Sequence, residues 1–368
     1  MIGLTKHAHR AAAGLAAAVA ALGLTPAAQA QVDFSGETVE FVVPFSESGG
    51  TARWANFYAP LLSEALPGNP TVVVRYRPGA GSTQGANWFQ DQQDEGDGTL
   101  IFGTSGSTQF PYLLGDPRVR YDYTDWKVVL ASGVGGVAYL PPDLAGEMEG
   151  LDATPLQDTN FLWGAQRATG LDLVPNLAWT MLGLTVDPVF GIEGRGDGRL
   201  MFERGEANID YQTSPAYLRS VVPMVEDGMA VPMMSWGALD DDGNIVRDPT
   251  FPDMPTFKEV CEATPDCSTE GDAFSAWKAF FIAGFPAQKM VFLPSSASQE
   301  VVDTYTQAFR DIIARDDFDE IKQATLGDYP QLTGPAAQRA KELATDVPDS
   351  AKQYVRDWLQ EAYGVELE

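Results

Sequence analysis

Two glycine-rich loops near the start of the chain carry residue types that bind anions through the backbone. The first, Ser46-Glu-Ser-Gly-Gly50, follows an apolar run at residues 39–45 and precedes an amphipathic segment at about residues 51–66. The second, Pro78-Gly-Ala-Gly81, follows the apolar run at residues 72–76. Glycine lets the main chain approach a ligand closely, and a helix start presents free N–H groups with partial positive charge. The order strand, glycine loop, helix and strand therefore predicts an anion site at the first loop.

Arginine occurs in two settings that could serve such a site. Arg167 lies in the small-residue segment Gly164-Ala-Gln-Arg-Ala-Thr-Gly170, directly after a predicted strand at residues 161–163. Its guanidinium could pair bidentately with a carboxylate, or it could solvate a surface loop of an acidic protein. The sequence leaves both interpretations open. For Arg53, in the first turns of the segment 51–66, we expect an ion pair at the surface or between lobes.

Most enzyme chemistries lack their residues in this chain. The only two histidines, His7 and His9, lie in a segment that we expect to be removed, so Ser-His-Asp catalysis and His-ligated zinc are excluded from the mature chain. No nucleophile elbow, zinc-protease motif or phosphate-binding loop occurs. We therefore expect no catalytic residue, no metal and no cofactor. An exported enzyme with an unrecognised acid or serine site is the alternative from another class.

The charge of the chain limits its partners. It contains 51 acidic and 24 basic residues and has a formal net charge of −27. Nucleic acids and anionic membranes would repel such a protein, so we expect no nucleic-acid partner. The acidic residues are dispersed along the sequence, which indicates a solubilising surface.

The first thirty residues have the pattern of a signal peptide. Lys6 and Arg10 precede an alanine-rich apolar stretch, and Ala28-Gln-Ala30 forms a cleavage site of small residues. The apolar stretch is shorter than the roughly 20 residues that a membrane span needs. We expect cleavage after Ala30, export, and a periplasmic mature protein.

Cys261 and Cys267 are the only cysteines and enclose a short loop. In an exported protein such a pair is more often a disulfide than a thiol site. We predict a disulfide between Cys261 and Cys267 that braces the chain locally.

Short apolar runs alternate with helix-length amphipathic segments, which predicts an α/β fold. Besides the segments above, we predict strands at residues 99–103, 128–131, 136–140, 186–190, 230–236, 277–282 and 290–293, and helices at about 85–93, 174–182, 299–315 and 349–363. The pattern of strand, small-residue loop and helix occurs twice, which predicts two lobes facing a cleft. Each lobe is expected to be a mixed, mostly parallel sheet flanked by helices, with crossing strands as the hinge. We assign residues 1–30 to the signal peptide, 31–138 with 271–368 to the first lobe, and 139–270 to the second.

A series of short motifs over most of the chain carries a family resemblance. In order, these include Val43-Pro-Phe45, Arg77-Pro-Gly-Ala-Gly81, Asp97-Gly-Thr-Leu100, Thr124-Asp-Trp126 and Met254-Pro-Thr256. Their order and spacing resemble the substrate-binding receptors of tripartite tricarboxylate transporters, the TctC or Bug family of periplasmic proteins. The resemblance implies the two-lobed Venus flytrap architecture, a monomer, and closure on a small carboxylate ligand that is delivered to membrane permease subunits. A ligand-sensing receptor that feeds a sensor kinase is the alternative.

The resemblance also implies a set of ligand-binding residues. These are Ser46, Glu47, Ser48, Gly49, Gly50, Thr51, Thr104 and Ser105 in the first lobe, and Ala165, Gln166, Arg167, Thr169 and Gly191 in the second. Glu47 and Arg167 depart from the residues common in the family. A carboxylate at position 47 would repel an anion, so the ligand is expected to carry an amine or to differ in length from a tricarboxylate.

Overall fold

The structure, a computed structural model, describes residues 32–240 and 242–367. The predicted signal peptide, with His7 and His9, lies outside the described residues. Among the helices of the described ranges, none has the length and apolarity needed to cross a bilayer.

A six-stranded sheet with the order β13-β4-β12-β3-β1-β2 forms the centre of the first lobe. Its strands are β1 (Thr38–Val43), β2 (Thr71–Tyr76), β3 (Leu100–Gly103), β4 (Lys127–Ser132), β12 (Lys289–Leu293) and β13 (Gln331–Thr333). The first three strands pair in parallel, whereas β12 and β13 pair antiparallel with their neighbours. The predicted mixed α/β fold is confirmed, but antiparallel pairing is more frequent than predicted because the two late strands run opposite to the first four.

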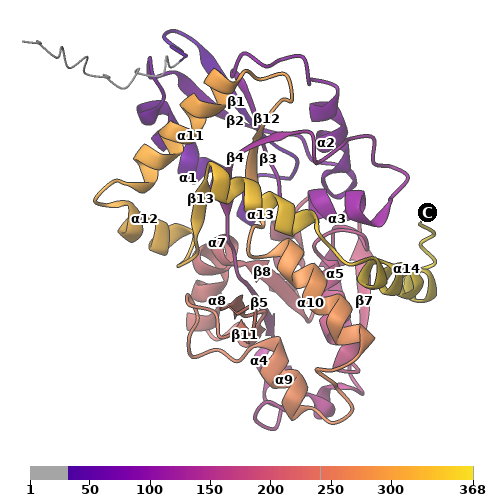
Figure 1. The fold of residues 1–368 in the computed structure, drawn as a ribbon. Coiled ribbons are helices and arrows are strands. Elements are labelled where there is room, and N and C mark those ends of the chain that lie inside the picture. The colour runs from indigo at the N-terminus through magenta and orange to yellow at the C-terminus, as the bar shows by residue number, and fades with distance from the viewer. Residues whose placement is uncertain (1–31, 241, 368) are drawn as a thin grey trace, which may run out of the picture. The chain divides into compact units, whose positions relative to one another are not determined.

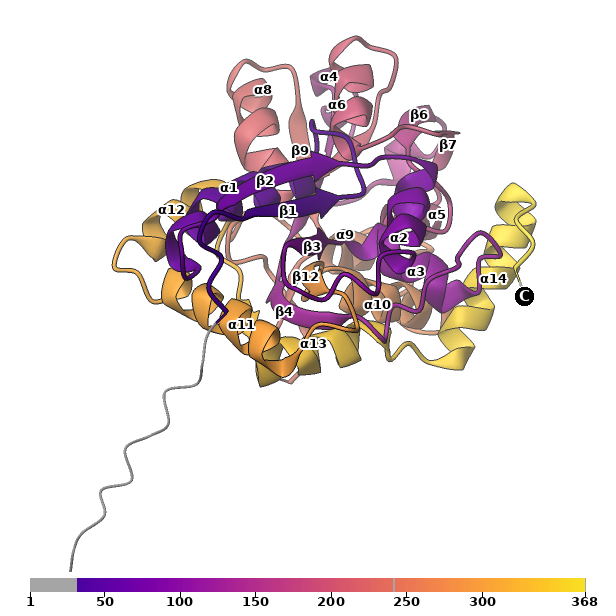
Figure 2. The same ribbon diagram turned by 90° about the horizontal axis from the view of Figure 1, so that it is seen from above.

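Alternation along β1 divides the core of this lobe into two layers. Phe41 and Val43 pack on one face of the sheet with Trp54, whereas Val42 packs on the other face with Phe89. Side chains of a strand point alternately to its two faces, so one apolar strand serves both layers. The first face is covered by α1 (Gly50–Ala65), α11 (Gln299–Ile313) and α12 (Phe318–Thr325), and the second by α2 (Thr83–Gln90) and α13 (Pro335–Thr345). Figure 2 shows α11 and α12 on one side of the sheet and α2 on the other.

The second lobe contains smaller sheets. Its strands are β5 (Gly136–Leu140), β8 (Asp210–Thr213) and β9 (Val231–Ser235) in an antiparallel sheet, β6 (Asn160–Ala165) and β7 (Thr185–Phe190) in a parallel pair, and β10 (Ala238–Leu239) with β11 (Ile245–Val246). Its main helices are α5 (Leu173–Met181), α6 (Arg195–Glu203), α8 (Val222–Glu226) and α9 (Phe257–Ala263), with short turns α4 (Pro142–Ala145), η2 (Thr154–Leu156), α7 (Ser214–Ala216) and the π-helical turn η3 (Tyr217–Val221). The remaining elements are η1 (Ala80–Ser82), α3 (Gly106–Leu114), α10 (Asp272–Gly284) and α14 (Asp349–Tyr363).

The strand predicted at residues 277–282 is wrong. These residues lie inside helix α10, which packs against α5 and α14. Trp277, Phe280 and Phe281 are all buried in the same core. A helix that is buried on most sides loses the polar face that identifies an amphipathic helix, so a run of apolar residues within it resembles a buried strand.

Two of the chain segments that link the six-stranded sheet to elements packed in the core around α5 lie side by side. Residues 133–135 lead from β4 to β5, and residues 285–288 lead from α10 to β12. The crossings are hydrogen-bonded to each other, because the Val134 N–H donates to the Phe285 carbonyl oxygen at 3.0 Å. The lobe boundaries at 138/139 and 270/271 stay a prediction, since the described residues form one compact unit. Helices α10 and α14, assigned to the first lobe, lie beside α5 of the second (Figure 1).

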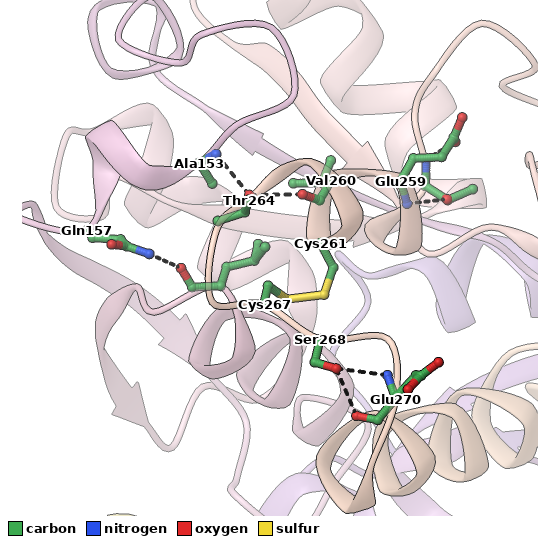
Figure 3. Close-up of a disulfide and its surroundings, with 11 residues drawn as sticks. Ala153, Gln157, Glu259, Val260, Cys261, Thr264, Cys267, Ser268 and Glu270 are labelled. Atoms are coloured by element: carbon green, nitrogen blue, oxygen red, sulfur yellow. Dashed lines mark hydrogen bonds between the residues drawn. A yellow bond between two sulfur atoms is a disulfide. The ribbon is translucent and has the colours of Figure 1, made fainter.

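The predicted disulfide between Cys261 and Cys267 is confirmed, with its two Cα atoms 5.1 Å apart. It ties the end of α9 to the following turn (Figure 3). Between the two cysteines, Thr264 Oγ1 accepts a hydrogen bond from Ala153 N at 3.0 Å and donates to the Val260 carbonyl at 2.9 Å. The bond therefore braces a local turn, far in sequence from the glycine loops.

Candidate functional site

A small cavity of about 20 Å³ lies where the loop after β1 meets the loops of the second lobe. It is lined by Phe45, Gly49, Gly50, Thr51, Ser105, Ser107, Gln166, Leu171, Gly194, Arg195, Thr213, Gln288 and Lys289. These residues include two cations and no carboxylate. In a chain of net charge −27 this composition is unusual. The cavity is therefore suited to an anion.

Three helices begin at the cavity. Their N-cap residues are Gly49 for α1, Ser105 for α3 and Gly194 for α6, and a first-turn residue of α1, Thr51, also lines it. Neither α1 nor α3 has an acidic residue in its first turn. The first N–H groups of a helix lack intrahelical acceptors, and its N-terminus carries partial positive charge. Converging helix starts thus supply donors for an anion without further side chains.

Lys289 brings a full positive charge to the cavity. Its side chain is 1% exposed, and Nζ donates to Thr51 Oγ1 at 3.2 Å and to Gln288 Oε1. Both acceptors are neutral, and an ammonium has three N–H donors. Burial lowers the pKa of Lys289 to about 7. A buried ammonium is normally paired with an anion, and among the described residues Lys289 has none.

Two buried amides add donors of the same kind. Nε2 of Gln166 and Nε2 of Gln288 each lack a hydrogen-bond acceptor among the described residues. The other end of each amide is held, since Gln166 Oε1 accepts from Ser107 Oγ at 3.4 Å and Gln288 Oε1 accepts from Lys289. An unpaired buried N–H group costs roughly 1–3 kcal/mol, which an acceptor in the cavity would recover.

Arg195 is the second cation of the lining, and residues that do not line the cavity fix the position of its side chain. Its guanidinium forms ion pairs with Asp210 and Asp172 and stacks over the rings of Trp163 and Tyr211. Burial on its own would lower the pKa of Arg195, but the two carboxylates raise it, so the guanidinium stays charged. Its Nε has no acceptor among the described residues. The carboxylates thus orient the arginine at the start of α6.

The structure brings five of the residues predicted from the resemblance to this cavity. They are Gly49, Gly50, Thr51, Ser105 and Gln166. The first three are consecutive, so the anion loop identified in the sequence does face the cavity. Their role in ligand binding stays a prediction.

Three predicted residues of the first loop lie outside the lining. Ser46 and Ser48 contact the start of α6 instead: the Ser46 N–H donates to the Glu193 carbonyl at 3.3 Å, and Ser48 Oγ donates to Asp197 Oδ1 at 3.2 Å. Glu47 is exposed and lines a separate groove. The expectation that Glu47 selects the ligand of the cavity is therefore not supported by its position.

Four other predicted residues support the surrounding fold. Thr104 is buried behind the cavity, where its hydroxyl lies 3.2 Å from that of Tyr123. The Ala165 carbonyl accepts from the N–H groups of Gly191, at 3.0 Å, and Ile192. Thr169 donates to Asp116 at 2.9 Å, and Gly191 is exposed. None of Thr104, Ala165, Thr169 and Gly191 lines the cavity.

Arg167 pairs with a carboxylate of the chain itself, and its role in ligand binding stays a prediction. Its side chain is 5% exposed, so it does not solvate the surface, and it does not line the cavity. It forms an ion pair with Asp116 and donates to the Ala80 carbonyl at 2.8 Å and to Thr83. These contacts join the loop after β6 to η1 and α2.

Arg53 differs from its prediction, because it donates to Ser220 Oγ at 3.0 Å and has no ion pair among the described residues.

Sequence reasoning missed the cations of the cavity. Arg195 belongs to an Arg-Gly-Asp tripeptide, a composition typical of a polar turn, but residues 195–197 begin α6, with Asp197 accepting from the Gly194 N–H at 2.9 Å. Lys289 stands at the start of β12, and its only local signal is a polar pair, Gln288-Lys289, before an apolar run. The other missed lining residues are Phe45, Ser107, Leu171, Gly194, Thr213 and Gln288.

Comparison with known proteins identifies the fold. The sequence matches no protein-family model and no curated protein. Among solved structures, the periplasmic binding protein BugD is 21% identical, with a TM-score of 0.64 over 90% of this chain and 99% of its own. MatC from Rhodopseudomonas palustris with bound malate is 17% identical, with a TM-score of 0.58 over 88% and 99% of the two chains. An R. palustris protein with adipate is 18% identical, with a TM-score of 0.62 over 91% and 99%.

These similarities extend over nearly the whole of each compared protein. They show that the chain has the two-lobed α/β fold of periplasmic binding proteins. The resemblance to TctC or Bug receptors stated from the motifs is therefore confirmed at the level of the fold.

Proposed function

We propose that this protein is an extracytoplasmic solute receptor of the TctC or Bug type that binds a small carboxylate between its lobes. The observation that carries the proposal is the lining of the cavity: Lys289 and Arg195, two unpaired amide donors and three helix starts, with no carboxylate. Malate and adipate in two structures of the same fold support the carboxylate class.

Binding would combine positioned donors with exclusion of water. A carboxylate head group would accept from the first N–H groups of α1 and α6, from Gln166 or Gln288, and from the ammonium of Lys289. Hydrogen bonds to a charged group contribute about 1.5–3 kcal/mol each, and they strengthen when the surroundings exclude water. The cavity of about 20 Å³ holds little more than one small group, so a longer ligand requires the lobes to separate about the crossings at 133–135 and 285–288.

The receptor is proposed to be periplasmic after cleavage behind Ala30 and to act as a monomer. It would deliver its ligand to the permease subunits of a tripartite tricarboxylate-type transporter. No chemical step is proposed, because the site offers donors for holding an anion and no activated nucleophile.

The test is the substitution Lys289→Met, which keeps the length of the side chain and removes its charge. We expect carboxylate affinity to fall by about 10- to 100-fold, the equivalent of one charge-assisted hydrogen bond. A thermal-shift panel of mono-, di- and tricarboxylates identifies the ligand, and calorimetry then measures the change.

The matched control is Lys341→Met. Lys341 is also buried, but its ammonium donates to the backbone carbonyls of Thr124 and Trp126, away from the cavity. This variant should lose stability and keep its affinity. Equal affinity in Lys289→Met and the unaltered protein would reject the proposed site.

A further inference from the structure

A groove outside the cavity gathers positive charge beside the first turns of α1. Its volume is about 430 Å³, and it is lined by Glu47, Arg53, Asn56, Phe57, Pro215, Arg219, Ala324 and Thr325. The walls come from α1 and α12 of the first lobe and from residues 215–219 of the second. The groove therefore spans both lobes, as the cavity does, but it shares no lining residue with the cavity.

The two arginines of the groove have no carboxylate partner within hydrogen-bonding distance among the described residues. Arg53 donates to Ser220 Oγ at 3.0 Å, and its Nε is buried without an acceptor. Arg219 is exposed. A third arginine nearby, Arg199, is already paired with Glu203. Burial lowers the pKa of Arg53, and the positive charges of Arg219 and Arg199 lower it further, so these cations lie close enough to repel one another.

The local backbone sets this groove apart from an ordinary surface. Arg219 and Ser220 belong to the π-helical turn Tyr217–Val221, and such turns are rare and frequently mark functional sites. Glu47 is the only carboxylate of the lining, so the groove keeps an excess of one positive charge. The chain has a net charge of −27, so acidic side chains that could neutralise two neighbouring arginines are abundant. Because Glu47 is the only one in the lining of the groove, an anion from solution would relieve the repulsion between the arginines.

We propose that this groove is a second anion-binding site, which takes a small carboxylate-bearing solute between Arg53 and Arg219. The site is distinct from the cavity and does not depend on the ligand proposed for it. A solute held by α1 on one wall and by the 215–221 segment on the other connects the two lobes. It should therefore favour the present arrangement of the lobes, and binding at the cavity and at the groove should strengthen each other to the same degree.

The test is a calorimetric titration of the protein with citrate at constant ionic strength, in four single variants. Arg219→Gln should weaken the groove's binding event about three- to fivefold, as expected for a partly exposed ion pair. Glu47→Gln should strengthen the same event by a similar factor, because it removes the only repelling charge. Both side chains are exposed, so neither change should prevent folding.

Two further variants separate this site from its alternatives. Arg339→Gln, on the exposed surface of α13, makes the same charge change elsewhere and should leave citrate binding unchanged. Lys289→Met should remove the event at the cavity and leave the groove's event in place. If the unaltered protein shows the groove's event but binds no carboxylate at its cavity, the proposed receptor function fails while this inference stands.

The inference is overturned by either of two results. One is that Arg219→Gln and Glu47→Gln behave like Arg339→Gln. The other is that Lys289→Met abolishes all citrate binding, which would leave a single site at the cavity.

Discussion

At the residue scale, the distinctive feature is a buried lysine with neutral neighbours. Lys289 is 1% exposed and contacts Thr51 and Gln288, in a protein with about two acidic residues for each basic one. Acidic residues are abundant in the sequence, yet none of the described ones pairs with the Lys289 ammonium. The cavity thus holds an uncompensated cation whose desolvation an anion would offset.

This lysine makes carboxylate binding dependent on pH. Burial lowers the pKa of Lys289 to about 7, and a bound carboxylate would raise it again by stabilising the ammonium form. Above about pH 7, binding must therefore take up a proton, and we expect affinity to fall by up to about tenfold per pH unit. Below that pH the affinity should stay level until the ligand itself is protonated. Calorimetry between about pH 6 and pH 9, in buffers of different ionisation enthalpy, measures both the affinity and the proton uptake.

The stability of the ligand-free protein should depend on pH in the opposite direction to carboxylate affinity. The unfolded chain binds the lysine proton more tightly than the folded chain does, so the free energy of unfolding should rise as the pH increases above about 7 towards about 10.4. Lys289→Met should flatten both dependences. A pH-dependent affinity that persists unchanged in this variant would show that another group titrates.

At the scale of elements, the site depends on how closely two loops approach each other. A Cβ atom added to Gly196, in the first turn of α6, would lie 2.5 Å from the Ser48 carbonyl oxygen and 2.6 Å from the Ser48 Cβ. Ser48 in turn bonds Asp197 of the same helix. The starts of α1 and α6 can therefore approach closely enough to face one anion because Gly196, at their contact, has no side chain.

Gly196→Ala tests this close approach. Alanine favours the helix, so α6 should remain folded, but the added methyl group should push the two loops apart. We expect the free energy of unfolding to fall by about 1–3 kcal/mol, the range for overpacking a tight contact, and carboxylate binding to weaken because the two helix starts move apart. Gly146→Ala is the control: it lies at the exposed end of α4, outside the cavity lining, and its added Cβ would lie 3.3 Å from the nearest atom, the Pro142 carbonyl oxygen. Similar calorimetric affinities for the two variants would contradict the argument.

At the scale of the whole molecule, a buried ion pair ties distant segments together. Arg167 and Asp116 are 5% and 0% exposed, and the same carboxylate also accepts from Arg118 at 2.7 Å. Burial on its own would raise the pKa of Asp116, but the bonds from Arg118 and Arg167 hold it below its usual range. The group therefore stays ionised and joins the loop after β6 to the turn after α3.

Removing one partner should leave a buried charge unpaired. We expect Arg167→Met to reduce the free energy of unfolding by about 3–5 kcal/mol. Arg118→Gln, which removes the 56% exposed partner of the same carboxylate, should cost only about 0.2–1 kcal/mol. Urea denaturation measures both values. Unchanged stability with a loss of carboxylate affinity in Arg167→Met would instead restore the ligand-binding role that the sequence left open.

Much of the fold could be predicted from local patterns. The strands β1, β2, β5, β7 and β12 and the helices α1, α5, α11 and α14 lie within a few residues of their predicted positions, because each carries its own apolar periodicity. Helix α10 was mistaken for a strand since its buried surroundings removed that signal. The anion loop was found for the same local reason: Gly49, Gly50 and Thr51 are consecutive and follow a strand.

By itself, the sequence determined the α/β class, the glycine loop that opens α1 and the pairing of Cys261 with Cys267, each of which depends on neighbouring residues. The tertiary structure decided which charges meet. Thr51 and Lys289 are 238 positions apart and touch only after β12 enters the sheet, while Arg167 turns from the cavity to Asp116. Secondary structure follows from local sequence patterns. The partner of a buried cation instead depends on which distant segment packs against it, and no periodicity in the sequence indicates that contact.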